Sequence, residues 1–439
     1  TEAERFEASV AEFEKCTGID VEHTGTTELR SQLLNGSGAD LSSSRGASPS
    51  SQDNPENLPD LAIVPQPGMV AELVDTGVVH PLPNPVNSNV EAGWDRHWIQ
   101  VGIHASVPYA APLMASVKSL VWYSPDAFAK AGYKVPGTWA ELEALTRKVR
   151  ADHPDGSVTP WCVGASDGES TGWVMTDWLE DVMLSTQGSG AYETWASHRV
   201  PVDSSGAVEA LDAVSSLVLA DGNVAGGRGS IISRSPEQAG ADLVKGSCLM
   251  LHASSSFENR FPEGTAITDA DGANPVAVQA PTATGSVAAE GGGKTAGPTA
   301  SSTSSGTKVS AFVTPAMDRG SDAVLVGTDY LVAFTRSDAA NAVMAYLTSR
   351  DWARTRMAMG GVATAYQGVD PDLVPSDVGR RATTLLQSRQ TTVEMDASDS
   401  MPVGVGSSAL WLALSRWSTG AMTSQEALTQ AESAWPKQK

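Results

Sequence analysis

The sequence predicts an α/β protein with more than one domain, and three observations support this prediction. The chain has 439 residues, which is longer than a chain that folds around one ordinary hydrophobic core. Its hydrophobic content of 41% is that of a globular protein. Short apolar runs with strand character alternate with amphipathic helical patterns, and this alternation is typical of mainly parallel sheets.

The chain opens with a predicted helix. In "AERFEASVAEFEKCTG" the residues Phe6, Val10 and Phe13 recur at helical spacing, and Gly18 ends the pattern as a C-terminal glycine. The following run "IDVEHTG" predicts a short strand. "DLAIVP" predicts a second, buried strand, and "QPG" predicts a turn at its carboxyl end.

After the strand "SLVWY" come two helices with clear end signals. "SPDAFAKAG" has Ser124 as N-cap, Pro125 at the first helical position and Gly132 after the end. "TWAELEALTRKVRAD" begins with a capping box of Thr138 and Glu141. Further along, "AVEALDAVSSLVLADG" predicts a helix and "CLMLH" predicts a strand.

The last third predicts one long strand or a strand pair in "AVLVG…YLVAF", followed by helices in "SDAANAVMAYLTSRDWARTRMA" and "TSQEALTQAESAW". Thr423 and Glu426 form a capping box for the last helix. Two stretches break the pattern, residues 36–59 and 269–308, which are rich in Ser, Gly, Ala, Thr and Pro. They carry too few large apolar groups to offset their ordering entropy. We expect both to be flexible surface insertions.

Composition excludes several classes of protein. The formal charge of −22 argues against nucleic-acid binding, which needs clustered Lys and Arg. No apolar run approaches the ~20 residues of a membrane span. The first residues predict a polar helix and not a signal peptide, so an exported chain would already have lost its targeting segment.

The three cysteines, Cys16, Cys162 and Cys248, lie too far apart for a metal motif. Cys162 and Cys248 are compatible with one disulfide in an oxidising compartment, and three buried free thiols are the alternative. The chain contains no nucleophile elbow, metalloprotease motif or phosphate loop. We therefore expect no catalytic motif, no metal and no cofactor.

Tryptophan is over-represented, with 12 Trp against 7 Tyr and 7 Phe. In "STGWVMTDWLED" Trp173 and Asp177 are four residues apart and share a helix face, whereas Trp178 points elsewhere, into a core. One interpretation is an amphipathic helix with a wet acidic face. The other is a carbohydrate site, because indole packs against the C–H face of a sugar and an ionised carboxylate accepts two adjacent hydroxyls.

Seven stretches in fixed order carry a family resemblance: "FEKCTGIDVEHTG", "PDLAIVPQPG", "KSLVWYSPDAFAKAGYKVPGTWAELEAL", "WCVGASDGESTGWVMTDWLED", "GSCLMLHASSSFENRFPEG", "MAYLTSRDW" and "DASDSMPVGVGSSALWLAL". They resemble the extracellular solute-binding proteins of carbohydrate ABC importers (family 1), most closely the α-glucoside and maltose-type receptors. The resemblance covers nearly the whole chain apart from the two insertions.

The resemblance implies a two-lobe periplasmic-binding-protein-like fold of type II, maltose-binding-protein-like, with hinge crossovers and a cleft between the lobes. The N-terminal lobe is expected to contain residues 1–117 and 250–326, and the C-terminal lobe residues 118–249 and 327–439. The crossovers should fall near residues 117–120, 249 and 327. The family also has a strand before the first helix, so we expect residues upstream of Thr1, with a lipid-anchored Cys beyond them.

The resemblance also implies ligand-binding residues. Trp173 and Asp177 match a family motif at the cleft edge of the second lobe. Trp411 is similar in place to an aromatic residue that stacks on a sugar ring; its alternative is a core tryptophan on an apolar helix. Gln66 matches a first-lobe strand end that faces the cleft, and Asp329 matches a family aspartate after the last crossover.

Three more residues follow from the same resemblance. Asp396 and Asp399 match the loop before Trp411, and one of the two is expected only to cap or turn the backbone. His252 matches a family histidine, although a histidine after a strand is more often a satisfied, half-buried residue.

The expected function is binding without chemistry. The protein would bind a di- or oligosaccharide, an α-glucoside of the maltose or trehalose type, and deliver it to membrane permease subunits of an ABC transporter. It would act as a monomer outside the cell membrane. A glycoside hydrolase that uses Asp177 and Glu180 as paired carboxylates is one alternative, and an adhesion or structural module is another.

Overall fold

The computed structural model describes residues 2–36, 58–268, 276–277, 307–317 and 323–437. The two segments predicted as surface insertions, 36–59 and 269–308, lie largely outside these ranges. Within the described residues, strands and helices alternate in mixed α/β order, as predicted.

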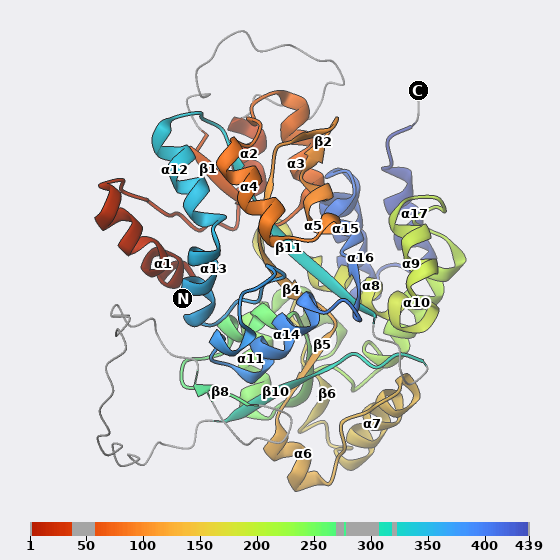
Figure 1. Ribbon diagram of the computed structural model, residues 1–439. Coiled ribbons are helices and arrows are strands. Elements are labelled where there is room, and N and C mark those ends of the chain that lie inside the picture. The colour runs from red at the N-terminus through yellow and green to blue at the C-terminus, as the bar shows by residue number, and fades with distance from the viewer. Residues whose placement is uncertain (1, 37–57, 269–275, 278–306, 318–322, 438–439) are drawn as a thin grey trace, which may run out of the picture.

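The first sheet is built around β11 (Ala323–Ala333), the long strand that crosses the centre of Figure 1. The second half of β11 pairs antiparallel with β1 (Leu61–Val64), and its first half pairs parallel with β12 (Thr392–Met395). On its other side it pairs antiparallel with β4 (Ala111–Val117). The pattern "AVLVG…YLVAF" is therefore one long strand, which pairs with β12 along its first half and with β1 along its second half.

The second sheet has the order β6-β7-β5-β10-β8-β9. Its strands are β6 (Thr159–Trp161), β7 (Cys248–His252), β5 (Leu120–Tyr123), β10 (Lys308–Val313), β8 (Ala266–Ile267) and β9 (Val276–Ala277). Two pairs are parallel, but β5 is antiparallel to both of its neighbours. The prediction of mainly parallel sheets is therefore wrong, and the sheets are mixed. Strand β5 follows directly after β4 and lies between two strands from much later in the chain. A two-stranded sheet joins β2 (Ile103–His104) and β3 (Val107–Pro108).

One predicted strand is absent: residues 19–25, "IDVEHTG", pair with no strand among the described residues and are irregular. A β pattern needs a neighbour to form its ladder, and no described strand lies beside this segment.

The predicted helices form with the expected ends. Ser124 Oγ accepts a hydrogen bond from the Ala127 amide at 3.3 Å, and Gly132 adopts a left-handed conformation at the other end. The capping box of Thr423 and Glu426 is present. The helices are α1 (Glu2–Thr17), α2 (Leu29–Gly36), α3 (Pro67–Thr76), α4 (Asn84–Gly93), α5 (Arg96–Val101), α6 (Pro125–Ala131), α7 (Trp139–Asp152), α8 (Trp173–Gln187), α9 (Ser189–Ala196), α10 (Ser205–Leu217), α11 (Pro236–Lys245), α12 (Asp338–Leu347), α13 (Arg350–Ala358), α14 (Asp377–Gln387), α15 (Ala397–Ser400), α16 (Trp411–Ser418) and α17 (Ser424–Ser433).

The packing of the helices shows which parts of the chain lie together. Helix α12 packs against α4 and α13 packs against α1, so the chain after β11 returns to the N-terminal helices (Figure 1). Residues 308–313, as β10, pair with β5 and β8 in the second sheet. The crossover expected near Leu249 falls inside β7, which stays within that sheet between β5 and β6. The sequence pattern locates the strands but does not show which sheet each one joins.

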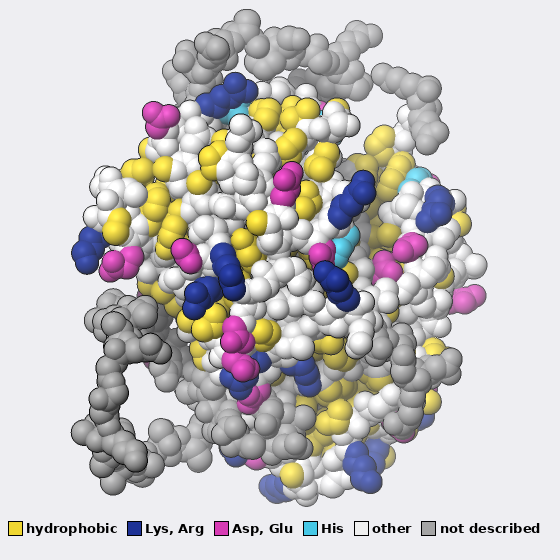
Figure 2. Space-filling view, in the orientation of Figure 1, with side chains coloured by type: hydrophobic (Ala, Val, Ile, Leu, Met, Phe, Trp, Pro, Cys, Tyr) yellow, Lys and Arg dark blue, Asp and Glu magenta, His cyan; other side chains and the backbone are white. Residues whose placement is uncertain are grey.

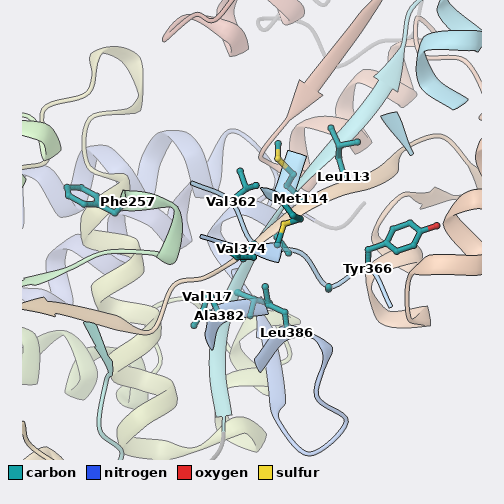
Figure 3. Packing of buried hydrophobic residues seen from close by; sticks show 14 of the residues in the cluster. Leu113, Met114, Val117, Phe257, Val362, Tyr366, Val374, Ala382 and Leu386 are labelled. Atoms are coloured by element: carbon teal, nitrogen blue, oxygen red, sulfur yellow. The ribbon is translucent and has the colours of Figure 1, made fainter. Parts of the chain in front are cut away.

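Apolar side chains from β4 and from residues 362–386 pack together beside the junction of the two sheets (Figure 3). Trp178 is buried in a separate cluster, edge-on to Trp161, as predicted. Cys162 and Cys248 form a disulfide with a Cα–Cα distance of 5.4 Å. Cys16 is free and exposed, so the alternative of three buried thiols is wrong.

Acidic and basic side chains are interspersed on the face in Figure 2, without an extended patch of one charge. None of the helices that the structure describes has the length and apolar character to cross a bilayer.

Candidate functional site

The site is organised around Lys118, which lies between β4 and β5. Its ammonium is 3.0 Å from Asp177 Oδ1, 2.5 Å from Asp396 Oδ2 and 3.2 Å from Asp399 Oδ2. The aspartates come from α8 and from the start of α15, and Lys118 N donates a hydrogen bond to Leu325 O of β11 at 2.7 Å. Three predicted site residues from two distant stretches are thus brought to one cation that the sequence analysis did not identify.

The three carboxylates are not equivalent. Asp177 and Asp396 are 3% and 2% exposed, whereas Asp399 is 14% exposed. Burial raises the pKa of Asp177 to about 6 against the opposing effect of Lys118. Burial and the neighbouring Asp396 raise the pKa of Asp399 to about 8. For Asp396 burial is outweighed by Lys118 and by hydrogen bonds, so its pKa is lowered.

Asp396 also shapes the backbone. Its Oδ1 accepts the amide of Asp399 at 2.8 Å and the hydroxyl of Ser398 at 2.8 Å, which makes it the N-cap of α15. One of the two aspartates was predicted to have such a capping role. Because Asp396 is buried and engaged on both oxygens, Asp399 is the member of the pair that remains open to a ligand.

Gln66 lies at the N-terminus of α3, directly after β1. Two residues on, a Cβ atom on Gly68 would overlap the carbonyl oxygen of Met401 and would lie 3.2 Å from the carbonyl oxygen of Asp399. The chain just after β1 therefore lies beside residues 399–401, and Gln66 is two residues from this contact. Nearby, Glu72 accepts the amide of Val403 at 2.8 Å.

Trp173 is half-buried at the first position of α8, one turn before Asp177. Its indole N–H donates to Asp167 Oδ2 at 2.9 Å, and the Arg260 guanidinium lies 5.8 Å from the ring centroid. The ring is thus fixed at its polar edge by Asp167, has the Arg260 guanidinium over it, and is half-buried. This arrangement suits stacking against an apolar ligand face.

Trp411 begins α16 and is only 4% exposed. Its carbonyl oxygen lies so close to Gly172 that a Cβ atom there would overlap it, so the starts of α8 and α16 are in contact. The indole N–H is buried without a hydrogen-bond partner among the described residues. Trp411 therefore adjoins the Trp173 turn but is a buried side chain in this structure.

Asp329 lies on β11, opposite Met114 of β4, and is half-buried. Burial and the nearby charge of Glu2 raise its pKa to about 7, and Lys118 opposes this shift. Within the described part of the chain its carboxylate makes no hydrogen bond that the structure records. Asp329 therefore lies close enough to interact electrostatically with Lys118. Its carboxylate oxygens are engaged in no hydrogen bond recorded among the described residues.

His252 does not join these residues. Its side chain is completely buried, with Nε2 2.8 Å from Asp181 Oδ2 and the ring stacked on Trp178. Asp181 in turn accepts a hydrogen bond from Ser119 Oγ, which itself accepts the amide of Leu325 at 2.7 Å. The predicted ligand contact at His252 is replaced by a buried network that joins β7, α8 and the chain next to Lys118.

Glu180 is also structural. It is buried and accepts the amides of Ala397 and Ser398 at 2.7 and 2.9 Å and the hydroxyl of Tyr192 at 2.5 Å. Asp177 is held by Lys118. A hydrolase needs two carboxylates that flank a substrate bond, and both members of the pair considered from the sequence are committed to other groups.

The described residues contain no group of His, Cys, Asp or Glu side chains that could hold a metal ion. The arrangement offers carboxyl oxygen acceptors at Asp399 and Asp329 and a half-buried indole at Trp173, but no activated nucleophile. Such groups bind hydroxyl-rich molecules. Lys118 was missed because a lone lysine before a strand has no distinctive sequence pattern.

Comparisons with known proteins identify the family of the chain. The family model of bacterial extracellular solute-binding proteins matches residues 1–226. The chain is 27% identical to the osmoprotective compounds-binding protein GgtB of Synechocystis sp., over 99% of this chain and 90% of that protein. It is also 27% identical to the alpha-glucosides-binding periplasmic protein AglE of Rhizobium meliloti, over 98% of this chain and 83% of that protein.

Among solved structures, the bacterial solute receptor AcbH matches with a TM-score of 0.72 at 15% identity, over 98% of this chain and 94% of AcbH. This similarity shows the two-lobe, maltose-binding-protein-like fold. The chain is a member of the bacterial extracellular solute-binding proteins, a family of binding proteins and not of enzymes.

Proposed function

We propose that this protein is the extracytoplasmic receptor of a carbohydrate ABC transporter. It binds a di- or oligosaccharide between its lobes and delivers it to membrane permease subunits. The observation that carries the proposal is the cluster of Asp177, Asp396 and Asp399 around Lys118, with Asp329 within electrostatic reach and Trp173 one turn before Asp177 on α8. These are the groups that a sugar ring with hydroxyls at its rim requires.

The ligand contacts we propose are Trp173, Asp399, Asp329 and Gln66, because each of these side chains keeps part of its surface open. Trp173 stacks on a sugar ring, and the carboxylates accept hydroxyl hydrogens. Trp411 is buried beside the first turn of α8, which begins at Trp173, and supports that turn. Asp177 and Asp396 act through Lys118.

We propose lobes that follow the observed packing. The first lobe contains residues 2–117 together with α12 and α13, and the second contains the β5–β10 sheet with α8, α15 and α16. The crossovers then lie at 117–120, within β11 and before β12. A ligand that contacts both lobes favours the closed arrangement through its higher affinity for it.

An α-glucoside is the ligand class we propose, supported by the sequence resemblance and by the similarity to AglE, which is named as an alpha-glucosides-binding protein. The other relative is named for osmoprotective compounds, and AcbH is described as having an exclusive preference for β-D-galactopyranose. Discrimination among these classes depends on the linkage and on the epimer at each hydroxyl.

The test is a binding screen with the full chain. Thermal shift and calorimetry with glucose, galactose, maltose, trehalose, maltotriose and glucosylglycerol should show a saturable increase in midpoint with at least one α-glucoside, because a ligand that binds only the folded state stabilises it. Absence of binding across this panel contradicts the proposal. Saturation by galactose alone would keep the receptor function and replace the α-glucoside class.

A further inference from the structure

The Lys118 ammonium uses all of its hydrogen-bonding capacity inside the protein. An ammonium has three N–H donors, and each has one aspartate partner, at 2.5 Å for Asp396, 3.0 Å for Asp177 and 3.2 Å for Asp399. The longest bond belongs to the most exposed carboxylate. Lys118 itself is 13% exposed. Two partners therefore hold the cation from the buried side, and the third lies where a ligand would reach.

Lys118 also lies where the two sheets meet. It follows the last residue of β4 and precedes β5, which belong to different sheets. Its backbone N–H bonds to β11, and the neighbouring Ser119 bonds to Asp181 of α8. Any relative movement of the sheets about this crossover changes the surroundings of the ammonium and of the carboxylates that it holds.

We propose that Lys118 is the positioning residue of the sugar site, which holds Asp399 in binding geometry through the buried pair Asp177 and Asp396. The inference rests on the proposed sugar-binding function. Without the ammonium, three neighbouring carboxylates would repel one another, and burial would favour their neutral forms. A neutral carboxyl is a weaker acceptor for sugar hydroxyls than a carboxylate, so Lys118 controls both the place and the charge of Asp399.

The charged groups around Lys118 define how the cluster responds to pH. The acidic groups that interact with Lys118 come from α8, from the start of α15 and from β11. They are Asp177, Glu180, Asp396, Asp399 and Asp329. His252 of β7 interacts with Asp177, and Glu2 of α1 interacts with Asp329. Burial and the neighbouring Asp396 raise the pKa of Asp399 to about 8. Sugar affinity should therefore increase as the pH rises through about 8, where Asp399 ionises.

The experiment measures the dissociation constant of Lys118→Met between pH 6 and pH 9.5, with the sugar of the panel that binds the wild type most tightly. We expect affinity at pH 9 to fall at least tenfold, because Asp399 is ionised there in the wild type. We also expect the rise in affinity to move to higher pH, because the remaining carboxylates lack their counter-ion. Lys148→Met is the matched control: it removes an exposed lysine 2.9 Å from Asp152 and should leave both the affinity and the pH profile unchanged.

Lys118→Arg decides the question if the Met variant does not fold. It keeps the charge, but its planar guanidinium cannot direct three donors from one nitrogen. We expect a severalfold loss of affinity with the pH profile retained. If either variant folds and binds sugar with wild-type affinity and a wild-type pH profile, the inference about Lys118 is wrong and the proposed function still stands. A wild-type protein that binds no sugar overturns the proposed function as well.

Discussion

Gly68, in the first turn of α3, lies directly against the carbonyl oxygen of Met401 at the end of α15. This contact joins the N-terminus of α3, which follows β1 of the first sheet, to residues 396–401, which include Asp399. Only a residue without a side chain permits this approach, so the position of Gln66 beside the site depends on it.

The first prediction is that Gly68→Ala weakens sugar binding about tenfold or more. The added methyl group meets backbone and not a flexible side chain, and overpacking of this kind costs about 1–3 kcal/mol. If α3 and α15 separate when the lobes open, the ligand-free unfolding midpoint should change little. Calorimetric titration measures the affinity. Gly190→Ala, in α9 with open space around the glycine, is the control, and equal affinities for both variants would contradict the prediction.

The second prediction concerns the indole of Trp173. Trp173→Ala should reduce sugar affinity at least tenfold, because it removes the stacking surface, worth about 0.5–1.5 kcal/mol in addition to the apolar area that it buries. Asp167→Ala should have a smaller effect, since it only frees the ring that Asp167 now holds at 2.9 Å.

Trp435→Ala is the comparison for Trp173→Ala. Trp435 is also half-buried but stacks on His198, with ring centroids 3.6 Å apart, outside the site. Loss of sugar affinity in Trp435→Ala equal to that in Trp173→Ala would show a general destabilisation and not loss of stacking.

The third prediction is that loss of the Cys162–Cys248 disulfide lowers stability. The bond closes a loop with a sequence separation of 86 residues, for which loop entropy gives about 4–5 kcal/mol. The double variant Cys162→Ser/Cys248→Ser should unfold at a markedly lower temperature. Cys16→Ser changes an exposed free thiol and should melt with the wild type. Coincident melting curves for all three proteins would refute the entropic estimate.

The sequence predicts the two-lobe α/β fold, but it does not show how the strands are arranged in the sheets or which candidate site residues are buried. Asp177, Asp396 and Asp399 do meet, because local motifs mark the ends of helices and strands where such groups gather. His252 looks like a ligand residue by position, yet it is buried against Asp181 and Trp178. Burial depends on which helix covers a strand end, and α8 covers this one. That information is not local.

Lys118 and the pairing of β10 with β5 show the same limit. Lys118 gains its role only when α8 and α15 deliver three carboxylates from residues 177–399. The pairing of β10 with β5 joins residues that are nearly 200 apart. By contrast, the caps at Ser124, Thr138 and Thr423 follow from neighbours within four residues and are all present.

The last prediction is a pH dependence from Asp329. Burial and the charge of Glu2 raise its pKa from the ordinary 3.8 to about 7 in the folded protein. The folded state therefore binds more protons than the unfolded state between these values, and its stability falls as the pH rises from about 4 to about 7. Asp329→Asn removes this titration. The variant should gain stability relative to the wild type above pH 7 and lose that advantage near pH 4.5.

Urea unfolding of both proteins at pH 4.5, 6 and 8 measures the effect. The control is Asp221→Asn, because Asp221 is exposed and its replacement should change the stability of the protein little. A constant offset between Asp329→Asn and the wild type at all three pH values would mean that Asp329 ionises in the folded protein as it does in the unfolded chain. In that case the carboxylate would lie in a well-hydrated recess, and its proposed hydrogen bonds to sugar hydroxyls would compete with water at little gain.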